Sequence, residues 1–353
     1  MSALQTRLQM ALTHWLESVW YGSRPIARGL LYPLGLLFCC LAGRRRERLS
    51  GEQARFPVPV VVVGNISVGG TGKTPLVIWL VGQLRAAGFK PGVVSRGVGS
   101  RQPASLPASA GRLVLPTDSA AEVGDEPLLI VQRTGVPLVV GKDRPAAIRT
   151  LLEHCPDCNL ILSDDGLQHY RMARDVEIVV LDGERRFGNG LCLPAGPLRE
   201  SPERVQSCDF VVVNNPSPDT PLQAGREFRM SMQGDTLLSL AAASPRPLSA
   251  LAGQAVHVVT AIGNPGRFLA RLQAVGIQYK LHAYPDHYHF TAQDIHFGDG
   301  LPVLMTEKDA VKCQGFAAAL LADVWYLPVE AHLDKMLLEV LLQRIAVVRQ
   351  GQV

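Results

Sequence analysis

Residues 60–74 read VVVVGNISVGGTGKT, a β-branched run that leads through a glycine-rich turn to Lys73 and Thr74. Such a run predicts a buried strand, and the glycines allow backbone N–H groups to converge on an anion. A helix that begins at Lys73 would add the favourable dipole of its N-terminus. The stretch therefore predicts a phosphate-binding loop between a strand and a helix.

This loop predicts that the chain binds ATP together with Mg²⁺. Lys73 is placed to reach the β- and γ-phosphates, and the hydroxyl of Thr74 is placed to hold Mg²⁺. A class of partitioning ATPases carries a second lysine where this chain has Val68, so that class is disfavoured. The usual loop pattern begins with glycine, which Ser67 replaces here. The predicted nucleotide-binding residues are Ser67, Gly69, Gly70, Thr71, Gly72, Lys73 and Thr74.

Short β-branched runs alternate with helical stretches from residue 57 onward. This alternation predicts an α/β fold of the P-loop NTPase type, a mostly parallel sheet flanked by helices, followed by a smaller α/β lobe. The expected strands are 58–63, 92–95, 137–140, 159–163, 177–181, 210–213, 256–261, 277–283, 302–305 and 324–327. The expected helices are 73–87, 126–134, 144–153, 266–274 and 334–348.

A proline-rich stretch, residues 214–221, interrupts this pattern and indicates a linker. Residues 223–239 are expected to form a hairpin that bridges the two lobes. We expect a membrane anchor over 1–50, a nucleotide-binding domain over 51–213, a hinge over 214–240 and a smaller domain over 241–353. The last helix is able to pack back on the first domain.

The net charge of +4 is concentrated at the N-terminus, because the first 50 residues contain seven arginines and only two acidic residues, Glu17 and Glu47. A nucleic-acid-binding protein spreads its basic charge over the folded domain, so this class is disfavoured. Here the basic residues follow an apolar segment, which favours the anionic head groups of lipids as partners.

The apolar segment Gly29–Gly43 is uncharged and is followed by RRRER. Fifteen helical residues reach about 22 Å, less than the roughly 30 Å of a bilayer core. Aromatic residues near it favour the head-group zone, so residues 5–45 are expected to form an interfacial, monotopic anchor. A helix packed on the protein's own surface is the alternative. A signal peptide is disfavoured because no small-residue cleavage site follows.

Three groups of polar residues are candidates for chemistry. Asp164 and Asp165 follow a predicted strand and are placed to bind Mg²⁺, directly or through water, although an Asp-Gly turn has the same sequence. Asp125 and Glu126 begin a predicted helix, where capping explains them equally well. The histidines in YPDHYHF (284–290) are expected to form hydrogen bonds rather than bind metal.

Seven scattered cysteines indicate a reducing compartment, and the pair in CPDC (155–158) is expected to lie in a plain loop.

The order of several long motifs resembles the tetraacyldisaccharide 4′-kinases, the lipid A 4′-kinases of Gram-negative bacteria. The resemblance covers nearly the whole chain. The motifs are GNISVGGTGKTP (64–75), SRGVG (95–99), VGDEP (123–127), KDR (142–144), SDDGLQH (163–169), LDGERRFGNGLCLPAGPLRE (181–200), IGNPGRF (262–268), YPDHYHF (284–290) and MTEKDAVKC (305–313). Val98 stands where the family usually has tyrosine.

The resemblance implies transfer of the γ-phosphate of ATP to the 4′-hydroxyl of a tetraacyl glucosamine disaccharide 1-phosphate, which gives lipid IVA. It implies an aspartate–histidine dyad, which maps onto Asp125 and His287, with His289 as the alternative histidine. Further roles implied by the family are Mg²⁺-side acids at Glu126, Asp164 and Asp165 and contacts to phosphates or substrate at Arg96, Arg144 and Arg199.

The same resemblance implies a substrate that stays embedded in the membrane. The chain is therefore expected at the cytoplasmic face of the inner membrane, with no obligate protein partner. Two rival hypotheses are an ATPase that is not a kinase and a nucleotide-binding scaffold without catalysis. Both are disfavoured because they leave the acidic and histidine motifs without a use.

Overall fold

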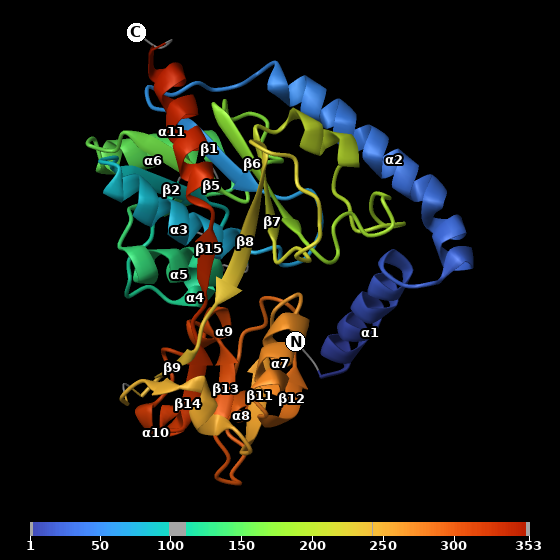
Figure 1. The fold of residues 1–353 in the computed structure, drawn as a ribbon, viewed down its shortest axis with the longest axis vertical. Helices are drawn as coiled ribbons and strands as arrows, with labels where there is room; N and C mark the ends of the chain where they lie inside the picture. Colours follow the sequence, from blue (N-terminus) through green and yellow to red (C-terminus); the bar gives the residue numbers. More distant parts are fainter. Residues whose placement is uncertain (1–2, 99–110, 242, 351–353) are drawn as a thin grey trace.

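The computed structural model describes residues 3–98, 111–241 and 243–350, so Gly99 of the SRGVG motif lies outside the described residues. Two lobes lie one above the other, and a helical arm formed by the N-terminus extends beside the upper lobe (Figure 1). The larger, upper lobe holds a nine-stranded sheet, and the lower lobe holds a six-stranded sheet.

The nine strands of the first sheet lie in the order β15-β8-β7-β6-β1-β5-β2-β4-β3. Neighbours pair in parallel except at the two edges, where β15 and β3 are antiparallel to their neighbours. The strands are β1 (Val60–Gly64), β2 (Pro91–Ser95), β3 (Arg112–Leu113), β4 (Leu138–Val140), β5 (Leu160–Asp164), β6 (Val176–Asp182), β7 (Phe210–Asn214), β8 (Glu227–Gln233) and β15 (Glu330–Leu333).

Strand β1 shows why this sheet needs helices on both faces. Val61 and Val63 belong to one buried cluster, and Val60 and Val62 belong to another. Successive side chains of a strand point to opposite faces, so a run of valines is stable only if both faces are covered. The first cluster is completed by α3 (Lys73–Ala86), α5 (Asp125–Thr134) and α11 (Lys335–Gln350), and the second by α6 (Arg144–His154).

The six strands of the second sheet lie in the order β10-β9-β14-β13-β11-β12. They are β9 (Thr236–Ser239), β10 (Arg246–Pro247), β11 (Ala255–Thr260), β12 (Gln278–Ala283), β13 (Val303–Thr306) and β14 (Val324–Leu327). The amphipathic helix α7 (Gly266–Ala274) buries Leu272 against this sheet. The short elements are α4 (Ala120–Val123), α8 (Ala292–Ile295), α9 (Glu307–Ala310), α10 (Ala318–Leu321), η1 (Pro202–Ser207) and η2 (Leu248–Leu251).

The chain crosses between the lobes twice, and both crossings adjoin the same pair of strands. β8 leads down into the second lobe and β15 returns from it, and the two pair antiparallel between Glu227–Gln233 and Glu330–Leu333. The region expected to form a bridging hairpin thus pairs with a strand from much later in the chain. Helix α11 then packs on the first lobe through Leu337, Leu341 and Ile345.

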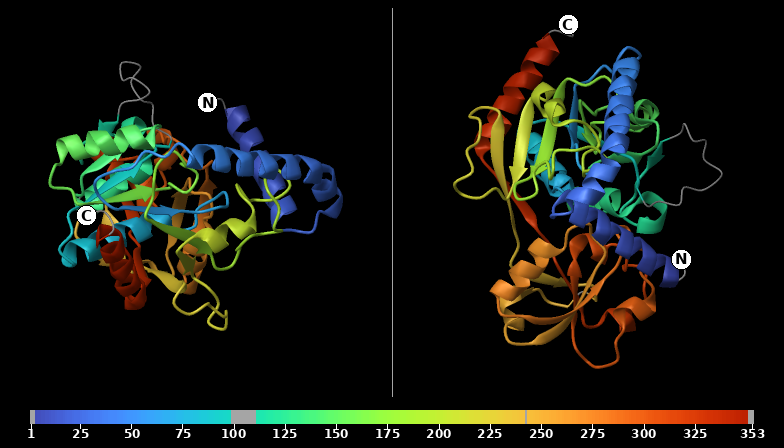
Figure 2. Two further views of the ribbon diagram at one scale, coloured as in Figure 1. Left: turned by 90° about the horizontal axis from the view of Figure 1, so that it is seen from above. Right: turned by 90° about the vertical axis from the view of Figure 1, so that its right-hand side faces the viewer.

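Two N-terminal helices, α1 (Ala3–Trp20) and α2 (Pro25–Ser50), form the arm beside the first lobe (Figure 2). Helix α2 is 26 residues long, longer than the apolar run that the sequence offers, because the arginines after Gly43 continue the helix. By length and composition alone it is able to cross a membrane. Gly35, in the middle of α2, lies against the first lobe, where an added Cβ would approach the carbonyl oxygen of Cys192 to 2.9 Å.

The expected strands and helices of both lobes are present, with ends shifted by no more than two residues. The fold class predicted from the sequence is therefore confirmed. The carboxyl ends of β1, β2 and β5 meet at one edge of the first sheet, the edge where open α/β sheets bind ligands.

Candidate active site

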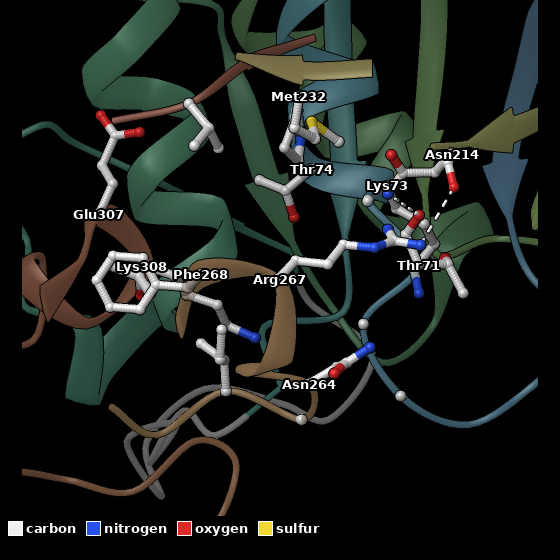
Figure 3. A pocket seen from close by; sticks show the side chains of 18 of the residues that line it. Thr71, Lys73, Thr74, Asn214, Met232, Asn264, Arg267, Phe268, Glu307 and Lys308 are labelled. Carbon is white, nitrogen blue, oxygen red and sulfur yellow. Dashed lines mark hydrogen bonds between the residues drawn. The ribbon is translucent and has the colours of Figure 1, made fainter. Parts of the chain in front are cut away.

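A cavity of about 1040 Å³ lies between the lobes. The first lobe contributes the glycine-rich loop after β1, and the second lobe contributes Asn264, Arg267, Phe268 and Lys308 (Figure 3). The lobes come close here, because a Cβ built on Gly263 would lie 3.5 Å from the backbone nitrogen of Gly70. The volume is large enough for a nucleotide, and part of an acceptor must approach from the open side.

The glycine-rich loop has backbone dihedral angles that are unfavourable for residues with a side chain. Gly69 and Gly72 have φ values of 100° and 95°, in the left-handed region that favours glycine. Gly72 immediately precedes α3, so the N–H groups of the first helical turn face the cavity edge of the loop. These dihedral angles are of the kind that a glycine-rich turn permits, and the binding of phosphate at this turn stays a prediction.

Two neighbouring segments hold the loop in place. The side-chain nitrogen of Asn214, at the end of β7, donates to the carbonyl oxygen of Thr71 at 3.0 Å (Figure 3). The backbone of Val68 donates to Pro197 at 2.9 Å, and that of Arg199 donates to Ile66 at 2.6 Å. These two bonds bring the PLRE segment alongside the loop, which explains how Arg199 reaches the cavity.

Asp165 joins the two cations of the loop region. Its carboxylate lies 3.4 Å from Lys73 Nζ and 3.4 Å from Arg199 Nη1. Burial alone would raise the pKa of Asp165, but Lys73 and Arg199 outweigh that effect and lower it to about 2. The side chain of Asp165 therefore stays ionised, and its backbone adopts a left-handed φ of 47°.

Asp164 lies behind Asp165 and is fully buried. Burial, together with the charges of Glu126 and Asp165, raises the pKa of Asp164 to about 7. The hydroxyl of Ser95 donates to it at 3.0 Å. The buried guanidinium of Arg144 donates to the carbonyl oxygen of Asp164 at 3.1 Å and to that of Gly141 at 2.6 Å.

The expected arginines thus occupy three different places. Arg199 lines the cavity, whereas Arg96 and Arg144 are not among the described residues that line it. Arg144 lies behind the site with no exposed surface, and Arg96 is exposed at the end of β2.

Asp125 and His287 come together across the lobes, although they are 162 positions apart in the sequence. Nδ1 of His287 lies 3.0 Å from one carboxylate oxygen of Asp125 and 3.1 Å from the other. His287 has a left-handed φ of 60°, a strained backbone for a residue of this type. His289 lines a small neighbouring cavity with Asp125, but the structure gives the hydrogen bond to His287.

The environment of Asp125 keeps its carboxylate charged. Burial would raise its pKa, but Lys308, the hydrogen bond from His287 and Lys312 together hold the pKa of Asp125 well below its usual value. In turn, burial would lower the pKa of His287, but its hydrogen bond to Asp125 raises it. The pair therefore consists of a fixed carboxylate and an imidazole whose tautomer that carboxylate sets.

The sequence matches the family described as tetraacyldisaccharide-1-P 4′-kinase over residues 27–346. The chain belongs to this family. A tetraacyldisaccharide 4′-kinase of Azotobacter vinelandii is 52% identical over 326 residues, which are 91% of this chain and 94% of that protein. A tetraacyldisaccharide 4′-kinase of Pseudomonas aeruginosa is 48% identical over the same shares of the two chains.

A solved structure agrees with this assignment. The crystal structure of LpxK from Aquifex aeolicus, described as an "apo" form in complex with ATP, aligns with a TM-score of 0.74 at 28% identity. The alignment covers 91% of this chain and 99% of that one. As a member of the family, the chain is an ATP-dependent kinase of lipid A biosynthesis that phosphorylates the 4′-hydroxyl of a tetraacyldisaccharide 1-phosphate.

The residues near the loop suit Mg²⁺. Among the described residues, no group of three or more histidine, cysteine or acidic side chains forms a ready metal cage. Asp164 Oδ1 is nevertheless buried without a hydrogen-bond partner, and Thr74 and Asp165 supply further oxygens at the same edge. Mg²⁺ prefers such oxygen ligands and completes its shell with water and phosphate, so the family's usual cation fits.

Two residues of this site received no role from the sequence. Arg267 Nη2 lies 2.8 Å from Asp182 Oδ1, at the end of β6, and ties α7 to the first lobe. Lys308 lies among three carboxylates at the cavity wall. Both fall in motifs that carried the resemblance, IGNPGRF and MTEKDAVKC, but spacing along the chain does not reveal partners in another lobe.

Proposed function

We propose that the Asp125–His287 pair is the base for phosphoryl transfer by this kinase. The observation that carries this proposal is the 3.0 Å contact between His287 Nδ1 and Asp125. An imidazole that donates its Nδ1 proton to a carboxylate has an unprotonated Nε2, which can accept the proton of the attacking 4′-hydroxyl. The charge of Asp125 stabilises the imidazolium that results, and this is the role that a carboxylate plays beside a catalytic histidine.

Lys73 and Arg199 are proposed as the cations that hold the transferring phosphoryl group. Both contact Asp165 in this structure, at 3.4 Å each. The phosphates of ATP offer them additional anionic partners at the same edge of the loop. Phosphoryl transfer depends mainly on positioning and on stabilising charge, so two fixed cations there suit the reaction.

Mg²⁺ is assigned to Thr74, Glu126, Asp164 and Asp165. When bound, the cation would neutralise negative charge on the phosphates. Asp165 and Glu126 line the cavity, and Asp164 lies behind them, so we assign the nearer position to Asp165. Burial of Asp164 beside two other acids raises its pKa, and a nearby divalent cation would favour its ionised form.

Arg144 and Arg96 are given different parts in this proposal. Arg144 donates to the carbonyl oxygen of Asp164, so it acts on the phosphates by fixing the turn that carries the acids. Arg96 is exposed and lies after β2, where it remains available for an anionic group of the acceptor.

The N-terminal arm is proposed to rest on the cytoplasmic face of the inner membrane. Leu30, Leu34, Leu37 and Leu41 of α2 are all more than half exposed, although leucine is normally buried. Because the middle of α2 packs on the first lobe at Gly35, a position along the bilayer surface fits better than a full crossing. The arginines that end the helix would meet anionic lipid head groups.

We further propose the division into an anchor (1–50), a nucleotide-binding domain (51–213), a hinge (214–240) and a smaller domain (241–353). Closure of the smaller domain would bring His287 to Asp125 and exclude water from the phosphates. Arg267, which joins α7 to Asp182 at 2.8 Å, supports such a closed arrangement.

The test replaces His287 with alanine and uses His289→Ala as the matched control. His287→Ala is expected to lower kcat by about 10²- to 10⁴-fold, the range of general base catalysis, with ATP affinity close to that of the wild type. His289→Ala is expected to keep most of the activity. The assay follows ³²P from γ-labelled ATP into the tetraacyldisaccharide acceptor. A large loss in His289→Ala with normal turnover in His287→Ala would reverse the assignment.

A further inference from the structure

Lys308 reaches from the second lobe into a group of acids that belong to both lobes. Its ammonium lies 2.9 Å from Glu126 Oε1, 3.5 Å from Asp286 Oδ1 and 3.9 Å from Asp125 Oδ2. The side chain is 20% exposed and forms part of the cavity wall, beside Glu307 and Phe268 (Figure 3). Lys308 helps to lower the pKa of Asp125, and its contacts with Glu126 and Asp286 give it a second, geometric effect on the site.

The second lobe holds Lys308 by a rigid local structure. Thr306 caps α9 by accepting from the backbone of Asp309 at 3.3 Å, and its hydroxyl donates to the Asp309 carboxylate at 2.7 Å. Asp309 is fully buried and also pairs with Lys312 at 2.8 Å. The direction of Lys308 is therefore set by the turn that begins α9.

The first lobe meets this turn through helix α5. Arg133 of α5 pairs with Glu307 of α9 at 3.0 Å, one residue before Lys308. Lys308 itself pairs with Glu126 in the first turn of α5. These two ion pairs bring the start of α9 against α5 when the lobes lie together, so the position of the ammonium depends on the lobes being closed.

The acids around Lys308 need a cation to stay together. Asp125, Glu126 and Asp286 carry like charges, and such charges repel strongly where little water separates them. Lys312, whose Nζ lies 3.7 Å from the same oxygen of Asp125, supplies the only other ammonium that the structure describes within 4 Å of these three acids. Loss of Lys308 would let Asp125 and Asp286 move apart. His287 directly follows Asp286 in the chain, and its ring contacts both acids, with Nδ1 3.0 Å from Asp125 Oδ1 and Nε2 3.8 Å from Asp286 Oδ2.

We propose that Lys308 is a positioning residue for phosphoryl transfer, which holds the Asp125–His287 pair in line with the nucleotide only when the second lobe has closed. The inference rests on the proposed role of that pair. Its consequence is that closure and activation are one event, because the cation and two of the three acids that it gathers come from different lobes. In an open enzyme the ring of His287 would have no fixed orientation. The enzyme would then transfer less of the γ-phosphate to water.

The test is a double-mutant cycle on the full-length protein, with ATP, Mg²⁺ and the tetraacyldisaccharide acceptor in mixed detergent–phospholipid micelles. The variants are Lys308→Met, Lys308→Arg, His287→Ala and the combination of Lys308→Met with His287→Ala. Lys280→Met is the matched control, since Lys280 is a lysine of the same lobe that is 63% exposed and pairs with Asp299. Melting temperature and ATP binding show that each variant is folded.

Lys308→Met is expected to lower kcat by about 100-fold, the loss that a misplacement of about 1 Å produces, while the KM for ATP stays near the wild-type value. Lys308→Arg should recover a large part of that loss, because it restores the charge. In the His287→Ala background, Lys308→Met should add little, since residues that act through one group are not additive. Lys280→Met should behave as the wild type.

Two results would overturn the inference. Wild-type turnover in Lys308→Met would show that the lysine does not position the pair. Losses that multiply in the double variant would show that Lys308 acts independently of His287. Normal turnover in His287→Ala is a separate outcome, which rejects the proposed base itself and the coupling with it.

Discussion

Gly72→Ala tests whether the shape of the phosphate loop depends on glycine at its last turn. Gly72 has a φ of 95°, and a Cβ there would lie 2.6 Å from Asn214 Nδ2 and 2.8 Å from Met232 Cε. The methionine end can move, but Asn214 is fixed by its bond to Thr71. An alanine at position 72 would therefore have two effects. It would strain the backbone, and it would displace the Asn214 side chain that holds the loop.

The expected cost can be estimated from two contributions. A left-handed backbone costs a residue with a side chain about 1–2 kcal/mol, and an extra methyl in a packed site costs about 1–3 kcal/mol. The lower entropy of alanine in the unfolded chain offsets about 0.4–1 kcal/mol of this. The free energy of unfolding of the first lobe should fall by about 1–4.5 kcal/mol, which at about 3 °C per kcal/mol corresponds to a melting temperature lower by roughly 3–14 °C.

Gly70→Ala provides the control within the same loop. Gly70 does not have a positive φ, and a Cβ there would have no neighbour within 4 Å. Thermal unfolding without nucleotide should show a clear drop for Gly72→Ala and almost none for Gly70→Ala. Equilibrium binding of ATP should weaken in Gly72→Ala as well. Equal stability of the two variants would refute the argument that glycine is required at position 72.

Three further predictions follow from other parts of the molecule. Leu34→Glu combined with Leu37→Glu should reduce binding to vesicles that contain anionic lipid by more than about tenfold, since burial of a leucine side chain contributes about 1.5–3 kcal/mol. Co-sedimentation with the vesicles measures this binding, and unchanged binding would disprove the proposed anchor. Arg133→Ala removes the 3.0 Å ion pair with Glu307 and should raise the KM for ATP by at most about fivefold, which is the contribution of a partly exposed ion pair. Steady-state kinetics at several salt concentrations measure the KM, and a far larger increase would contradict this prediction. Burial raises the pKa of Asp164 to about 7. Between about pH 4 and 7 the folded chain therefore keeps a proton on Asp164 that the unfolded chain has released. Without Mg²⁺, the free energy of unfolding should fall as pH rises through that range. Asp164→Asn should flatten this fall in urea unfolding at pH 5 and 8, and an unchanged slope would show that another group causes it.

The local features of this enzyme could be predicted from its sequence because short-range chemistry determines them. The valines of 60–63 form a strand buried on both faces, and Lys73 begins a helix after a glycine with positive φ. The ends of these elements differ from the expected ones by up to two residues, since strands continue for a residue or two wherever a neighbour offers a hydrogen bond.

The remaining features depend on contacts between distant parts of the chain. Lys308 lies 182 positions from Glu126, and nothing in the local pattern of either residue identifies the other. Arg144 shows a different limit, because an arginine beside a phosphate site suggests a phosphate contact, whereas the structure places it fully buried behind Asp164. Helix α2 extends beyond the apolar run Gly29–Gly43 at both ends, because apolar character does not mark the limits of a helix and arginine is itself a good helix former.

The pairing of β8 with β15 makes the lower lobe an insertion within the upper one. Residues 234–329 lie between two neighbouring strands of the nine-stranded sheet, and α11 covers that sheet only after β15 has been added. During synthesis, the nucleotide-binding sheet therefore cannot be completed until β15 and α11 have left the ribosome. A truncation near residue 328 would leave the edge of β8 unpaired and expose the apolar surface that Leu337, Leu341 and Ile345 cover, which would invite association with other unfinished chains.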